Sequence, residues 1–156
     1  MNGDFVQAAG VQQVHSNRDL SLTVAGNITN NGTLGAEGTL TLSGNQVTNQ
    51  AGAVIEGGAV AIRAAGDLAN SGEINGESAL DLVAANISNT AGIVGGNVAV
   101  RTGNLNNTGA NALIGSTGNM ALGVDGTLNN LQGGTLYSAA SMFIGATNGG
   151  LSAAGE

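Results

Sequence analysis

Aliphatic residues occur along this chain in pairs separated by a single residue, and the pairs recur about every twenty residues. Successive pairs begin 20, 20, 20, 18, 22 and 22 residues apart. The residue between the two is usually small or polar, and such alternation puts successive side chains on opposite faces of a β-strand. We therefore expect a short strand with one buried face at each pair: Leu20/Leu22, Leu40/Leu42, Val60/Ile62, Leu80/Leu82, Val98/Val100, Met120/Leu122 and Met142/Ile144.

A second aliphatic residue follows each of the first six pairs, and an Asn stands two residues after it in all six units. Asn tolerates the left-handed backbone conformation, and its amide both donates and accepts hydrogen bonds. Asn residues stacked in successive layers can therefore bond one another and hold the layers in register. We predict a structural Asn ladder formed by Asn30, Asn49, Asn70, Asn89, Asn107 and Asn130.

A Gly and a third aliphatic position complete each unit. The Gly lies two or three residues after the Asn, and the third aliphatic position is clear in three units. In the other three units two adjacent aliphatic residues compete for it, and the sequence leaves the choice open. The candidates are Leu34, Val54 or Ile55, Ile74, Ile93 or Val94, Leu113 or Ile114, and Leu136.

Three short strands in each unit, separated by Gly or Asn corners, describe one turn of a solenoid. Burying about four aliphatic side chains contributes roughly 1.5–3 kcal/mol each, whereas ordering about 20 residues costs on the order of 20–40 kcal/mol. One coil is therefore unstable alone and must stack on its neighbours. Helical repeats are excluded because good helix formers are scarce, and leucine-rich repeats because their order of Leu and Asn differs. We predict an all-β fold, a parallel β-helix of about seven coils.

The first part of the chain matches the repeat less well. Val14 falls 20 residues before Leu34, so we interpret residues 1–19 as a degenerate first coil or an N-terminal extension, and residues 20–156 as the β-helix. Residues 1–19 also lack the basic and apolar regions of a signal peptide. We therefore expect the chain to be a piece of a longer protein.

Composition excludes several classes of function. The net charge is −7, with three Arg and no Lys, so we expect no binding to nucleic acid and no attraction to an anionic membrane. No apolar run approaches the ~20 residues of a transmembrane helix, so we expect no membrane insertion. The chain has no Cys, which excludes disulfides and thiolate metal sites. We expect no cofactor.

The repeat resembles a known family. The pattern Gly-Asn-Leu-x-Asn, seen at Gly26–Asn30, Gly66–Asn70 and Gly103–Asn107 and followed by a Gly turn, is similar to the haemagglutinin repeats of filamentous haemagglutinin-type exoproteins. The resemblance covers about residues 20–150. These exoproteins are the secreted partners of two-partner secretion systems and include adhesins and contact-dependent growth inhibition toxins. The resemblance implies a right-handed β-helix filament, export through an outer-membrane two-partner secretion transporter, and a place outside a Gram-negative cell, secreted or on its surface.

Few residues suggest a catalytic role. We expect His15, the single histidine, to be an exposed coil residue. Asp67, Asp81 and Asp125 occupy different positions of the repeat, so they would not converge as the acids of a glycan-cleaving enzyme do.

Two further sets of charged residues recur at similar positions of the unit. Glu37, Glu56 and Glu77 fall at nearly the same place in three successive coils, which indicates a solvated acidic corner, or alternatively a weak Ca²⁺ site. Arg63 and Arg101 lie in one column two coils apart. Because Val83 lies between them, we interpret them as isolated surface charges.

These observations favour a structural shaft that extends a binding or toxin domain away from the producing cell. An alternative is direct adhesion to a cell-surface receptor or glycan, and a more remote one is a polysaccharide-active β-helix enzyme. Tyr137 and Phe143, near the last coils, mark either a sticky patch or residues covered by a following coil. Unpaired strands at the ends of the stack predict end-to-end self-association.

Overall fold

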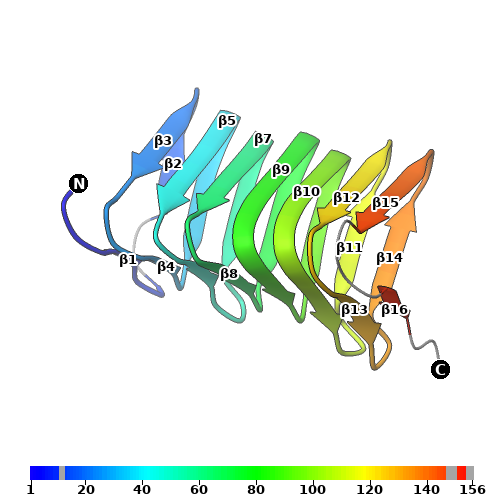
Figure 1. Ribbon diagram of the computed structural model, residues 1–156. Coiled ribbons are helices and arrows are strands. Elements are labelled where there is room, and N and C mark those ends of the chain that lie inside the picture. Colours follow the sequence, from blue (N-terminus) through cyan, green and yellow to red (C-terminus); the bar gives the residue numbers. More distant parts are fainter. Residues whose placement is uncertain (11–12, 147–150, 154–156) are drawn as a thin grey trace.

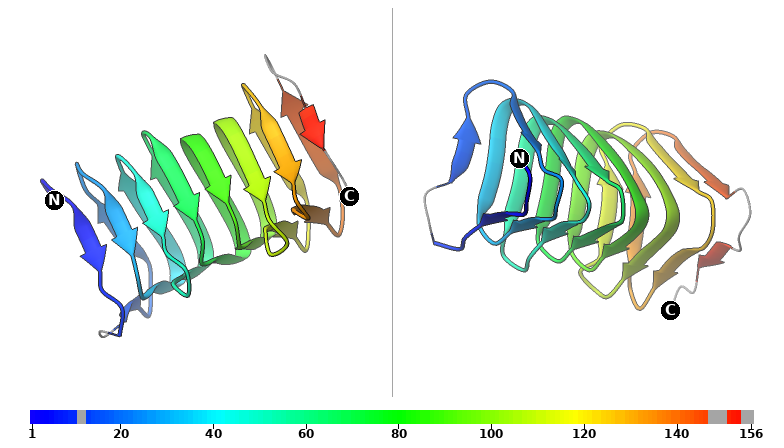
Figure 2. Two further views of the ribbon diagram at one scale, coloured as in Figure 1. Left: turned by 90° about the horizontal axis from the view of Figure 1, so that it is seen from below. Right: turned by 60° about the vertical axis from the view of Figure 1, so that its left-hand side comes forward.

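The protein is a stack of parallel β-coils. The computed structural model describes residues 1–10, 13–146 and 151–153, and every regular element in these residues is a β-strand. The coils follow one another along a single axis, with the two ends of the chain at opposite ends of the stack (Figures 1 and 2). The prediction of an all-β parallel solenoid with about seven turns is confirmed. The described residues contain no helix that is long and apolar enough to span a membrane.

Each coil contributes to three sheet regions. The longest strands bend around corners and belong to more than one region, and β9 and β10, with 17 residues each, pass through all three. We call the first region, which lies toward the viewer in Figure 1, the front sheet. It contains β3 (Leu20–Thr23), the second halves of β5 (Thr33–Gly44) and β7 (Val54–Ala64), the middle parts of β9 (Glu73–Asn89) and β10 (Gly92–Thr108), and β12 (Met120–Val124) and β15 (Met142–Ala146).

The other two regions use the remaining strands in the same parallel order. The Asn sheet contains β1 (Phe5–Gln7), β4 (Ile28–Asn30), β6 (Val47–Asn49), β8 (Asp67–Asn70), the ends of β9 and β10, β13 (Leu128–Leu131) and β16 (Leu151–Ala153). The third sheet contains β2 (Val14–Ser16), the first parts of β5, β7, β9 and β10, β11 (Leu113–Ser116) and β14 (Thr135–Ser138).

The register stacks like residues in columns along the axis. In the front sheet the first member of every aliphatic pair lies beside its equivalent in the next coil, from Leu20 to Met142. The core is therefore continuous, and Leu42, Ile62 and Leu82 are 0% exposed. Side chains of this size contribute roughly 1.5–3 kcal/mol each when fully buried, so most of the stability lies between coils.

The alignment of successive coils also decides which residue takes the third aliphatic position in the three ambiguous units. Ile55, Ile93 and Ile114 align with Leu34 and Ile74 and are fully buried. Their competitors are only half-buried, because adjacent residues of a strand point to opposite faces: Val54, Val94 and Leu113.

The corner between the third and front sheets is too tight for most side chains. A Cβ on Gly76 would collide with the carbonyl oxygen of Ala79. Where Ser116 takes this position, its hydroxyl lies 2.8 Å from the carbonyl oxygen of Gly96 and 2.9 Å from that of Asn119. This explains why the whole column consists of small residues: Ser16, Ala36, Gly57, Gly76, Gly95, Ser116 and Ser138.

Residues 1–19 contribute strands to the same stack. Phe5 pairs with Ile28 in the Asn sheet, and Val14 pairs with Leu34 in the third sheet. Both pairings continue columns that run through the later coils. A boundary at residue 20 stays a prediction.

Candidate functional site

The six predicted ladder residues are brought together inside the Asn sheet. Each of the first five side-chain amides donates a hydrogen bond to the Oδ1 atom of the Asn in the following coil, and Asn130 donates to the carbonyl oxygen of Gly134. From Asn30 to Asn130 the five N···O distances are 2.9, 2.9, 2.8, 2.8 and 2.7 Å. The first five side chains are at most 1% exposed. The ladder is thus a buried chain of hydrogen bonds that all run in one direction.

The ladder also fastens the corner that follows each Asn. The second amide hydrogen donates to a main-chain carbonyl in the next coil, as from Asn30 to Val54 at 2.9 Å and from Asn70 to Gly92 at 3.0 Å. The Oδ1 atom of Asn30 also accepts from the N–H of Gly32 at 3.1 Å. Among the described residues, no buried side-chain nitrogen or oxygen lacks a hydrogen-bond partner. Because the amides are fully used by the fold, these residues hold structure and offer nothing to a substrate.

A second, exposed series of polar side chains was missed by the sequence reasoning. Asn86 donates to Asp67 at 2.8 Å, Asn104 donates to Asn86 at 2.8 Å, and Asn104 accepts from the N–H of Thr127 at 3.0 Å. These side-chain amides donate toward the amino-terminal end, opposite to the inner ladder. The signal was the first Asn of the Gly-Asn-Leu-x-Asn pattern, which recurs less strictly because Gln46, Asp67 and Thr127 take its place in three of the six units.

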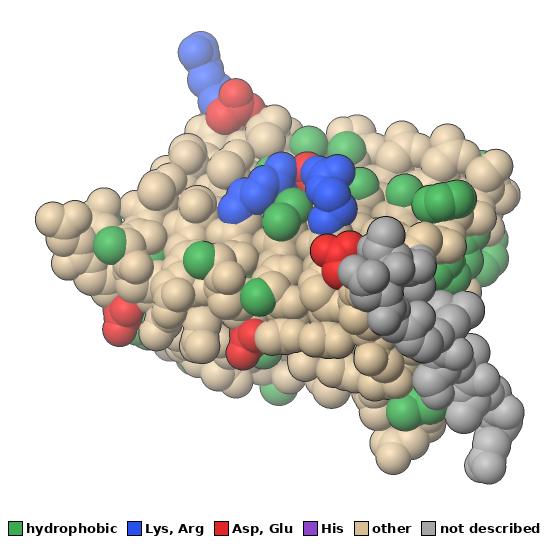
Figure 3. Space-filling view, in the orientation of Figure 1, with side chains coloured by type: hydrophobic (Ala, Val, Ile, Leu, Met, Phe, Trp, Pro, Cys, Tyr) green, Lys and Arg blue, Asp and Glu red, His purple; other side chains and the backbone are tan. Residues whose placement is uncertain are grey.

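The interpretation of Arg63 and Arg101 as isolated charges is wrong. One Asp81 carboxylate binds both: its Oδ2 atom lies 2.5 Å from Arg63, and its Oδ1 atom lies 3.3 Å from Arg101. Val83 does separate the two Arg residues in their own column. Asp81 nevertheless lies two residues before Val83 on the same face of the sheet. A long Arg side chain reaches such a diagonal neighbour on the adjacent strand. Figure 3 shows two basic side chains, in blue, close together near the middle of this face, with acidic atoms, in red, between them.

The three glutamates do not share one position. Glu56 pairs with Gly35 and Asn75, whereas Glu37 and Glu77 lie in the irregular segments where the register shifts. They line one shallow depression together with His15. No group of three or more His, Cys, Asp or Glu in the described part of the chain is arranged to hold a metal ion.

The remaining candidates are dispersed. His15 is exposed and lies over Gly35, where an added Cβ would be 2.6 Å from its Nδ1 atom. Asp67 belongs to the Asn sheet, Asp81 to the front sheet, and Asp125 follows β12. The three carboxylates therefore occupy separate places on the stack.

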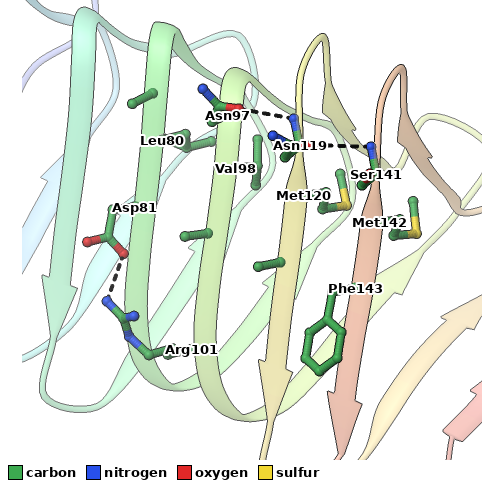
Figure 4. Close-up of a pocket in the computed structure, with 13 residues that line it drawn as sticks. Leu80, Asp81, Asn97, Val98, Arg101, Asn119, Met120, Ser141, Met142 and Phe143 are labelled. Atoms are coloured by element: carbon green, nitrogen blue, oxygen red, sulfur yellow. Dashed lines mark hydrogen bonds and ion pairs between the residues drawn. The ribbon is translucent and has the colours of Figure 1, made fainter.

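The outer surface of the front sheet carries a shallow groove of about 770 Å³ (Figure 4). Alanine methyl groups form much of its lining. Asp81 and Arg101 lie near one end and Phe143 near the other, while a row of polar residues follows one rim. The small residues are Ala79, Ala99 and Ala121, and the polar rim consists of Asn97, Asn119 and Ser141.

Two aromatic residues near the last coils are exposed, Phe143 at 69% and Tyr137 at 55%. Phe143 belongs to β15 in the front sheet, whereas Tyr137 belongs to β14 in the third sheet. Only Phe143 lines the groove.

Parallel coils with one aliphatic core and an internal amide ladder define the class of protein, a parallel β-solenoid. Residues 5–72 match the family model of the haemagglutinin repeat. This match and the solenoid fold fit a filamentous haemagglutinin-type repeat region, so the resemblance seen in the sequence is confirmed. Comparison with curated proteins and with solved structures gave no match.

Proposed function

We propose that this segment is a rigid length of filament that holds a binding or toxin domain away from the cell that produces it. The haemagglutinin repeat and the solenoid support a filament shaft segment of a haemagglutinin-like protein. The single observation that carries the proposal is the unbroken inner ladder from Asn30 to Asn130. It holds consecutive coils in one register over the length of the core.

Stiffness follows from the direction of the hydrogen bonds. In a parallel solenoid each coil contacts only its neighbours, and its inter-strand bonds run along the stack. Each added coil extends the filament by about 4.8 Å. Bending would stretch main-chain bonds on one side together with the buried amide bonds, so a long run of such coils behaves as a rod.

Export and position outside the cell belong to the same proposal. Proteins with this repeat are generally substrates of two-partner secretion, so the proposed partner is an outer-membrane transporter, and the proposed location is the medium or surface of a Gram-negative bacterium. The lack of Cys suits a chain that crosses a membrane unfolded, because no disulfide would have to form or break.

We also propose that the segment catalyses no reaction. The Asn amides are used by the fold, and the carboxylates of Asp67, Asp81 and Asp125 lie on separate parts of the stack. A pair of acids facing one bond, as glycoside hydrolysis requires, is not formed by these three residues.

Rigidity can be measured by pulsed electron paramagnetic resonance between two spin labels. The chain has no Cys, so the double variants S21C/A99C and S21C/A121C each carry only the intended labels. All three positions lie in one outward column, four and five coils apart, so the mean distances should be about 19 and 24 Å. Narrow distributions that differ by about 5 Å support a rod. Broad distributions, or equal means, would refute the shaft.

A further inference from the structure

The front sheet contains a notch one coil wide between Arg101 and Phe143. The register aligns Arg101, Gly123 and Gly145 in one column. The Phe143 ring extends over Gly145, where an added Cβ would lie 3.1 Å from its Cε1 atom. Gly123 has no side chain, so the space between the Arg101 side chain and the ring is left open. An added Cβ on Gly123 would lie 3.8 Å from the Cγ atom of Arg101, whose guanidinium turns toward Asp81. Figure 4 shows Arg101 and Phe143 toward opposite ends of the neighbouring groove.

Two Arg side chains and one Asp side chain meet beside the notch. Arg63 holds the Asp81 carboxylate at 2.5 Å, and its guanidinium also donates to the carbonyl oxygens of Ile62 and Asp81 at 3.2 Å. Arg101 makes one long contact of 3.3 Å to the same carboxylate, and its side chain is 65% exposed. Two guanidinium groups therefore share one carboxylate, and Arg101 keeps donors for an anion from outside.

The polar rim of the groove also offers donors. The Oδ1 atom of Asn97 accepts the N–H of Asn119 at 3.0 Å, and the Oδ1 atom of Asn119 accepts the N–H of Ser141 at 3.3 Å. Within the part of the chain that the structure describes, the NH₂ groups of Asn97 and Asn119 have no hydrogen-bond partner. A ligand that fits this rim must bring acceptors.

We propose that the groove binds an acidic polysaccharide that carries single carboxylates. The carboxylate lies against the Arg101 guanidinium, whose planar fork matches it. The sugar ring that bears it fills the notch over Gly123 and places C–H groups against the negative face of the Phe143 ring. The next sugar crosses Ala121, and its hydroxyl oxygens accept from the Asn119 amide.

A peptide fits this groove less well. Its main-chain N–H groups would find few strong acceptors at the rim, because the Oδ1 atoms of Asn97 and Asn119 each accept a main-chain N–H already. It also cannot add a strand, because β10 and β12 are each paired on both sides. A heavily sulfated chain is disfavoured because a protein with a net charge of −7 repels a dense polyanion.

The test is a titration of the whole chain with a hyaluronan hexasaccharide, which has one carboxylate per disaccharide, followed by calorimetry and by amide chemical shifts. The variants R101Q, F143A and G123L should each weaken binding at least tenfold. A Cβ on Gly123 would lie 3.6 Å from its nearest neighbour, an ordinary contact, so G123L fills the notch without disturbing the strand. R18Q removes the same charge from an exposed residue of the first coil and should change the affinity less than twofold.

Three results would overturn the proposal. One is the lack of saturable hyaluronan binding at millimolar concentration. Another is an equal loss in R18Q and R101Q, which would indicate attraction by net charge alone. The third is tighter binding of a heparin hexasaccharide or a hexaglutamate peptide at the same residues, which would assign the groove to another ligand class. The spin-label distances test the shaft independently of polysaccharide binding. If they are unchanged in R101Q, the coils are still stacked in that variant, whatever the titration shows.

Discussion

Asn49 and Asn70 lie one coil apart on β6 and β8, and the amide nitrogen of Asn49 is 2.9 Å from the Oδ1 atom of Asn70. Both side chains are almost completely buried. The same contact repeats above and below them, so each Asn is both donor and acceptor in one chain of bonds. A buried polar network of this kind is stabilising only while every member keeps its partners.

Replacement of Asn70 by Leu should lower the free energy of unfolding by about 2–4 kcal/mol. The change removes the acceptor of Asn49 and the donor to Asn89, and it leaves polar atoms of the corner buried without a partner. Urea denaturation followed by circular dichroism measures the loss. S88A changes an outward residue of the neighbouring strand β9 and should stay within about 0.5 kcal/mol of the unmodified chain. Equal stability of N70L and S88A would show that the ladder does not hold the coils.

Replacement of Gly76 or Gly123 by Ala should change the stability of the protein in opposite directions. In G76A the new Cβ meets the carbonyl oxygen of Ala79 at the tight corner, and overpacking of this kind costs about 1–3 kcal/mol. In G123A the Cβ has only ordinary contacts. Because Ala has less conformational freedom than Gly in the unfolded chain, the substitution should stabilise the folded protein by about 0.4–1 kcal/mol. Melting temperatures of the two variants decide this. A fall in both would mean that the strand at Gly123 is also crowded.

The Asp81 cluster should matter little for stability. Its three side chains are 34–65% exposed, and exposed ion pairs contribute about 0.2–1 kcal/mol. D81N should therefore reduce the free energy of unfolding by less than about 1 kcal/mol at low salt, and the difference should shrink at 1 M NaCl because salt screens exposed charges. E77Q removes an exposed acid outside the cluster and serves as the reference. A larger loss that persists in high salt would indicate that the cluster supports the strands.

Much of the fold could be predicted because the core consists of aliphatic residues at a nearly constant spacing. Leu40 and Leu80 are buried, as expected for the inward positions of strands whose side chains alternate between the two faces. The choice between Val54 and Ile55 could not be made within one unit, because it depends on alignment with Leu34 in the coil before.

The contacts of the candidate site were less predictable. The pairing of Arg63 and Arg101 with Asp81 joins neighbouring columns, whereas the repeat reveals only positions within one column. The groove was also hidden, since small residues such as Ala99 and Ala121 form much of its lining and do not stand out in a sequence rich in Gly and Ala.

The inner and outer rows of amides donate in opposite senses along the stack. If all the side-chain dipoles pointed the same way, each added coil would increase an electrical asymmetry between the two tips. The opposed outer row, which is interrupted at Gln46 and Thr127, offsets part of this moment. A gene that gained or lost whole repeats would therefore change the reach of the fibre with less polarisation than the inner row alone would cause.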